Sequence, residues 1–213
     1  MKNYFKNLKI LKDGNAYLKN MEHDACGVGL IASTEGKKSR KIVEYGINAL
    51  KAVFHRGAVD ADGKTGDGAG IHLEIPSDFF SEKIEITGHS HDGSEICVGM
   101  IFLPRNNYEA QENARTLVES ELTKSNFNIY GWRQVPVNPK VLGEKANLTR
   151  PEITQVLFKH NNKNLNGKDL ERKLYESRRK IEKEAIKNAI DGFYICSLSS
   201  KSIIYKGMFL AES

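Results

Sequence analysis

The sequence has few cysteines and no long apolar run. Its cysteines, Cys26, Cys97 and Cys196, are widely spaced in 213 residues without a C-x-x-C pair, so neither a disulfide scaffold nor a metal site is indicated. No apolar stretch approaches the roughly 20 residues that cross a bilayer. The first 25 residues lack an apolar signal segment, and they contain neither the Arg nor the Ser of a mitochondrial transit peptide. We therefore expect a cytoplasmic protein without a membrane partner.

The basic excess is small and evenly spread. The formal net charge is +5, yet residues 168–190 contain eight basic and five acidic side chains in one predicted helix. Such mixing is typical of a solvated helix surface and does not form a track for phosphates. Nucleic acid is therefore not an expected partner.

Apolar periodicity predicts interspersed helices and strands in a single α/β or α+β domain. The residues before position 20 form a Lys-rich arm that is either frayed or removed. Helices are predicted between Ser39 and Gly57, over 108–125 and over 168–190. Strands are predicted over 27–33, 71–75, 96–103, 131–137 and 153–159, and a closing hairpin over 193–198 and 202–206.

The glycine-rich loop at 57–70 is the first candidate for chemistry. It contains Gly63-Lys64-Thr65, but the spacing from Gly57 is one residue too long for a P-loop, and the loop follows a helix. The ligand positions of a calcium loop also fail. What remains is a tight turn whose glycines let the backbone approach another loop or a ligand closely. His89 and His91 have no third partner and are predicted to be solvated.

Cys26 is the second candidate. Cys97 and Cys196 lie inside apolar runs and are predicted to be inert core residues. Cys26 begins its run and is followed by Gly27. If the preceding peptide bond were cut, Cys26 would carry both a thiol nucleophile and an α-amino base. The pattern alone favours a structural cysteine, because free cysteines are usually buried, and leaves the catalytic interpretation open.

A series of segments resembles one family. The series comprises Asp24-Ala-Cys-Gly-Val-Gly-Leu-Ile-Ala32, His55-Arg-Gly-Ala58, Asp62-Gly-Lys-Thr-Gly-Asp-Gly-Ala-Gly70, Gly131-Trp-Arg-Gln-Val-Pro136, Leu142-Gly143, residues 171–182 and Phe193-Tyr-Ile-Cys-Ser-Leu198. In this order they resemble the amino-terminal glutaminase domain, a class II glutamine amidotransferase, of the glutamate synthase large subunit. The resemblance covers most of residues 22–209.

The resemblance implies a fold, a domain division and two site residues. The fold would be α+β: the four-layer α/β/β/α sandwich of an N-terminal-nucleophile hydrolase, here incomplete. Residues 1–25 would be a leader or propeptide, and 26–213 a partial glutamine amidotransferase domain. Cys26 would be the catalytic nucleophile that attacks the side-chain amide of L-glutamine through a thioester. Arg56 would help to shape the substrate-binding pocket.

The resemblance also implies what the complete enzyme contains. Ammonia from glutamine would aminate 2-oxoglutarate in a downstream domain that uses FMN and an iron–sulfur cluster; no cofactor is expected in this part. The rest of the synthase chain and a reductase small subunit would be its partners. The family's Arg-Phe-Ser-Thr and His-Asn-Gly segments are absent, so we expect a truncated chain with negligible activity alone. The alternative is a non-catalytic binding or regulatory module with a structural Cys26.

Overall fold

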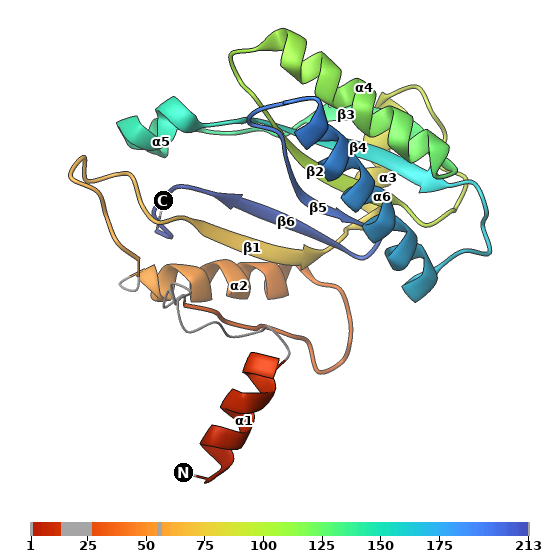
Figure 1. Ribbon diagram of the computed structural model, residues 1–213. Coiled ribbons are helices and arrows are strands. Elements are labelled where there is room, and N and C mark those ends of the chain that lie inside the picture. The colour runs from red at the N-terminus through yellow and green to blue at the C-terminus, as the bar shows by residue number, and fades with distance from the viewer. Residues whose placement is uncertain (1, 14–26, 55–56, 213) are drawn as a thin grey trace.

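The computed structural model describes residues 2–13, 27–54 and 57–212 (Figure 1). Its helices are α1 (Lys2–Asp13), α2 (Arg40–Ala52), α3 (Ser77–Ile86), α4 (Tyr108–Lys124), the short 3-10 helix η2 (Pro139–Val141), α5 (Glu144–Thr149) and α6 (Gly167–Lys187). Its strands are β1 (Ala69–Glu74), β2 (Cys97–Leu103), β3 (Phe127–Gln134), β4 (Glu152–His160), β5 (Tyr194–Ser199) and β6 (Ser202–Gly207).

The strands form two antiparallel sheets. The larger sheet has the order β3-β4-β2-β5, and the smaller one pairs β1 with β6. In the larger sheet, Met100 of β2 lies opposite Ser197 of β5, but the next residue, Ile101, lies opposite Ile195. This register shift is a β-bulge at Cys196. Bulges add local twist, and this one lies in the middle of β5.

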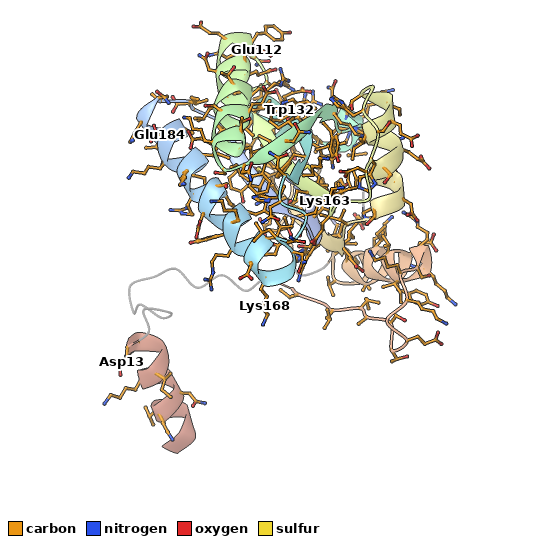
Figure 2. All side chains as sticks on the ribbon, turned by 90° about the vertical axis from the view of Figure 1, so that its right-hand side faces the viewer. Asp13, Glu112, Trp132, Lys163, Lys168 and Glu184 are labelled. Atoms are coloured by element: carbon orange, nitrogen blue, oxygen red, sulfur yellow. The ribbon has the colours of Figure 1, made fainter. Side chains whose placement is uncertain are left out.

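The elements stack in four layers. Figure 1 shows α2 beneath the β1–β6 sheet, the larger sheet above it, and α4 and α6 on the far side. Glu112 of α4 and Lys168 and Glu184 of α6 lie on the outside of this last layer (Figure 2). The order α2, small sheet, large sheet, α4 with α6 confirms the predicted α/β/β/α sandwich within the described residues. None of the described helices is both long and apolar enough to span a membrane.

Two apolar cores lie on opposite faces of the larger sheet, because side chains alternate along a strand. In β2, Cys97, Ile101 and Leu103 pack toward α4 and α6, whereas Val98 and Met100 pack toward the smaller sheet and α3. Both faces are therefore buried, as the continuous apolar run at 96–103 predicted.

One predicted strand and one predicted hairpin are wrong. Residues 27–33 form no strand, and Val28 and Leu30 are 92% and 88% exposed. An apolar run forms a buried strand only where a neighbouring strand and a facing layer accept it, and no described strand pairs with this one. The expected hairpin also fails: β5 pairs with β2 and β6 with β1, so the turn at Ser200 joins the two sheets.

Three α-helices differ from the predictions. The arm before residue 20 contains the helix α1. In α3, the fully buried Phe80 and Ile84 lie four residues apart, a spacing that places both on one helical face and that polar neighbours obscured. The six-residue α5 was not predicted. Short helices escape periodicity analysis because they contain too few turns to show a pattern.

Candidate functional site

A cleft of about 1140 Å³ opens between the two sheets at one end of the molecule. Its floor includes Met100 and Phe102 of β2 and Ile204 of β6. Its rim is formed by the start of β1, the end of β6, the segment 135–142 and the end of α5. Large, mostly apolar hollows with a few polar groups are the usual place for a small-molecule site. A second hollow, of about 810 Å³, lies at the end of α6 around Ile186 and Phe193.

Both predicted site residues, Cys26 and Arg56, lie outside the described residues, as does the predicted leader apart from α1. Their neighbours in the sequence can be placed. Gly27, which follows Cys26 directly, lines the larger cleft. Gly57, which follows Arg56, begins the glycine-rich loop, and that loop reaches the same cleft through Asp67 and Gly68. The cleft therefore adjoins the residue that follows Cys26, and it adjoins the far end of the loop that begins after Arg56.

The glycine-rich loop folds as a small hairpin. Val59 and Gly66 form an isolated antiparallel bridge, and the Asp60 N–H donates to the Thr65 carbonyl at 2.8 Å. The Asp67 carboxylate accepts the Ala58 N–H at 2.9 Å. Gly63 has a φ of +67°, in the left-handed region that glycine adopts without strain. The predicted tight turn is confirmed.

The partner of this loop is another loop, at the start of α5. Figure 1 shows the two at the same end of the molecule. Thr65 is buried, and its hydroxyl accepts the Ala146 N–H at 3.4 Å. The Lys145 ammonium donates to both carboxylate oxygens of Asp60, at 2.7 and 2.9 Å. The close approach inferred from the glycines is thus made to protein.

Most polar side chains that line the cleft form hydrogen bonds within the protein. Tyr205 accepts a hydrogen bond from Gln155, which is fully buried and accepts one from Arg133 at 2.6 Å. Lys206 donates to the Tyr194 hydroxyl at 2.8 Å. Arg150 differs, because its buried Nε has no hydrogen-bond partner in the described part of the chain. The network around Gln155 therefore holds Tyr205 at the cleft wall.

Two further cysteines and the two histidines of the segment before β2 make structural contacts. Cys97 and Cys196 are buried and free, and burial raises the pKa of both thiols, which confirms that they are inert core residues. His91 hydrogen-bonds Ser81 and the Ser94 carbonyl, and His89 hydrogen-bonds Thr87. Within 2–13, 27–54 and 57–212, no group of three His, Cys, Asp or Glu side chains could hold a metal ion.

Two antiparallel sheets lie between helical layers, and a cleft at one end adjoins the residue that follows a cysteine. This is the arrangement of the N-terminal-nucleophile hydrolase class. The family model of class-II glutamine amidotransferases matches residues 26–213. The chain belongs to this family. The match begins at Cys26, the predicted nucleophile. It does not favour the alternative of a non-catalytic module.

The similar proteins are much longer than this chain. It is 55% identical over 206 residues to the glutamate synthase [NADPH] large chain of Azospirillum brasilense, a stretch that covers 97% of this chain and 14% of that protein. It is 40% identical over 191 residues to the ferredoxin-dependent glutamate synthase of Pyropia yezoensis, with 88% and 12% covered. A chloroplastic ferredoxin-dependent glutamate synthase of Arabidopsis thaliana is 39% identical over 206 residues, with 95% and 12% covered.

The sequence analysis missed the contacts between the glycine-rich loop and α5. Asp62 accepts hydrogen bonds from the Lys64 N–H, the Thr65 N–H and the Thr65 hydroxyl, at 2.9, 2.7 and 2.6 Å. An aspartate in a glycine-rich segment is a local signal for such a turn, because its carboxylate can accept the backbone N–H two residues further on. Its partner Gly143 is some 80 residues away in the chain, and nothing in the local sequence of either segment indicates that the two meet.

Proposed function

We propose that this chain is the glutaminase part of a glutamate synthase. It hydrolyses the side-chain amide of L-glutamine, and the ammonia aminates 2-oxoglutarate reductively in a downstream domain. The family match that begins at Cys26 carries the proposal, and the cleft beside Gly27 supports it. The names of the relatives, glutamate synthases with NADPH or ferredoxin, support glutamate synthesis as the reaction of the complete enzyme.

In the proposed mechanism, removal of residues 1–25 gives Cys26 a free α-amino group. That group takes the thiol proton, and the thiolate attacks the amide carbon of glutamine. Collapse of the tetrahedral intermediate breaks the carbon–nitrogen bond, and the amino group returns the proton to the departing ammonia. Water then cleaves the thioester, which releases glutamate and restores the thiol. Arg56, which directly precedes the glycine-rich loop in the sequence, would shape the pocket for glutamine.

The redox chemistry of the complete enzyme would lie outside this chain. FMN and an iron–sulfur cluster are proposed for the downstream parts, where the electrons for the reductive step enter. The described residues do not fit such a cluster, because their two cysteines, Cys97 and Cys196, are buried in separate cores. No step assigned to this chain uses either group. The rest of the synthase chain and a reductase subunit are the proposed partners, in the cytoplasm.

The test uses the complete chain. We expect mass spectrometry of the active protein to find Cys26 at the mature N-terminus. Cys26→Ala should abolish glutamine-dependent glutamate formation and leave ammonia-dependent formation intact, because only the amide cleavage needs the thiol. Cys97→Ala is the matched control, since that cysteine is buried in the core toward α4 and α6, on the face of the larger sheet that points away from the cleft. An intact leader in active protein, or loss of both activities in Cys26→Ala, would refute the mechanism.

A further inference from the structure

Helix α5 begins without a side chain to cap it. Its N-cap residue is Gly143, which makes no side-chain cap hydrogen bond. The first N–H groups of a helix have no partner within the helix and need acceptors from elsewhere. Here the Ala146 N–H donates to the Thr65 hydroxyl at 3.4 Å. The acceptor therefore comes from the glycine-rich loop, some 80 residues earlier in the chain.

Asp62 completes this arrangement. The pKa of its carboxyl lies well below the ordinary value, chiefly because the carboxylate accepts a hydrogen bond from the Thr65 hydroxyl, and then because it accepts hydrogen bonds from the N–H groups of Thr65 and Lys64. The backbone N–H of Lys145, in the first turn of α5, lowers this pKa further. A carboxylate at a helix N-terminus is also favoured by the helix dipole. Asp62 thus orients Thr65 and faces the helix start at the same time.

The contact between α5 and the glycine-rich loop requires a glycine at position 143. Its φ of −71° and ψ of 167° suit any residue, so conformation does not explain the glycine. A Cβ placed there would lie 2.2 Å from both the Asp62 Oδ2 and the Thr65 Oγ1, and 2.4 Å from the Thr65 N. These distances are far shorter than van der Waals contact. Any side chain at residue 143 would therefore push the glycine-rich loop away from α5. We call Asp62, Thr65 and Gly143 the loop latch.

The loop latch fixes both sides of the cleft. On one side, α5 carries Ala146 and Thr149 into the cleft lining. On the other side, the hairpin joins Thr65 to Asp67, which lines the cleft and accepts a hydrogen bond from the Ala58 N–H. Ala58 is only two residues after Arg56. A displacement at Thr65 would therefore be transmitted along the hairpin to the chain that leaves Arg56.

We propose that Asp62 and Thr65 are positioning residues for the glutamine pocket, acting through the loop that follows Arg56. They touch neither the substrate nor the reacting atoms. The inference rests on the proposed function, because it takes L-glutamine as the ligand and Arg56 as a pocket residue. It adds that the pocket depends on a fixed distance between the glycine-rich loop and α5. That distance is set by the Thr65 hydroxyl, the Asp62 carboxylate and the absence of a Cβ at Gly143.

Two substitutions of Thr65 separate positioning from packing. Thr65→Val keeps the shape and removes the hydroxyl, whereas Thr65→Ser keeps the hydroxyl. In the complete chain, we expect Thr65→Val to raise the KM for L-glutamine by roughly 10- to 100-fold, since small misplacements of binding groups cost that much. Thr65→Ser should stay within about twofold of the parent. Ammonia-dependent activity, measured with ammonium chloride, should not change in either.

Gly143→Ala tests the other half of the loop latch. Its added methyl group should raise the KM for L-glutamine as Thr65→Val does. Lys64→Ala is the matched control from the same loop, because the Lys64 side chain has no hydrogen-bond or ion-pair partner in the described ranges. An unchanged KM in both Thr65→Val and Gly143→Ala would overturn the proposal. So would a parallel fall of glutamine- and ammonia-dependent activity, which would show a general loss of structure.

Hydrogen exchange distinguishes this inference from the proposed function. Thr65→Val should speed exchange of the Ala146 and Asp60 amides, and Thr65→Ser should not. If the parent lacks Cys26-dependent glutaminase activity, the proposed function fails and the inferred role fails with it, whatever the exchange rates. If the parent is active and the exchange or KM pattern is absent, only the inference fails.

Discussion

At the scale of single residues, missing side chains are as informative as present ones. Gly99 lies in the middle of β2, and a Cβ there would be 2.6 Å from Val156 Cγ1 and 2.8 Å from Leu198 Cδ1. Its glycine lets the flanking strands β4 and β5 bring large side chains together over β2 on the face toward α4 and α6. Tight cores tolerate added atoms poorly because their neighbours cannot move aside.

We predict that Gly99→Ala destabilises the protein by about 1–3 kcal/mol, the usual cost of overpacking. The measurement is the free energy of unfolding from urea titration. Gly36→Ala is no suitable control, because Gly36 has a φ of +65°. Gly29→Ala is suitable, since nothing lies within 4 Å of the added methyl group, and it should leave the free energy of unfolding unchanged. Equal effects of the two substitutions would contradict the packing argument.

At the scale of elements, one carboxylate attaches the segment between α3 and β2 to the larger sheet. Asp92 pairs with Lys159 of β4 at 2.8 Å and with Lys163 at 3.0 Å. Hydrogen bonds from Lys159, then from Ser94 and Lys163, hold the pKa of Asp92 far below its ordinary value of 3.8. The carboxylate is therefore charged in the folded protein down to a lower pH than in the unfolded chain.

The depressed pKa of Asp92 sets the sign of a pH effect. Its contribution to stability is complete above the unfolded pKa, near 3.8, and is lost as the pH falls through the folded pKa. We predict that Asp92→Asn lowers the thermal midpoint at pH 7 and that the difference from the parent shrinks below about pH 4. Asp191→Asn, whose side chain has no ion-pair partner in the described part of the chain, is the control. A difference that is constant with pH would contradict the assignment.

At the scale of the whole molecule, the larger sheet connects the two cores. Strand β4 places Val156 and Phe158 in the core under α4 and α6 and Leu157 in the core between the sheets. Loosening one core therefore disturbs the backbone that supports the other. The shared sheet therefore couples the two cores, and we expect them to unfold together, as the parts of one domain commonly do.

We predict a single unfolding transition whose midpoint falls when either core is truncated. Leu174→Ala, in the core under α6, and Leu157→Ala, in the core between the sheets, should each cost about 2–5 kcal/mol. Leu148→Ala is the control, because Leu148 is 70% exposed. The check is calorimetry with circular dichroism on the same samples. Two separate transitions, with each substitution moving only one of them, would show that the cores are independent.

The sequence by itself determined the elements with long, regular patterns. The runs at 96–103 and 153–159 were recognised as strands, and the period of 108–125 as a helix, because burial on one or both faces leaves a repeated apolar signal. The ordered motifs around Cys26, Gly57–Gly70 and Phe193–Leu198 determined the family. These features are local or short-range, so the sequence alone is enough to recognise them.

Only the tertiary structure decided which elements meet. It separated β5 and β6 into different sheets, left residues 27–33 without a partner among the described strands, and brought Gly143 to Thr65. Each of these outcomes depends on contacts between segments far apart in the chain, whose energy is gained only when a complementary surface is present. Gly27 and the end of the glycine-rich loop reach one cleft for the same reason, because the two sheets pack together and the start of α5 takes its capping group from that loop.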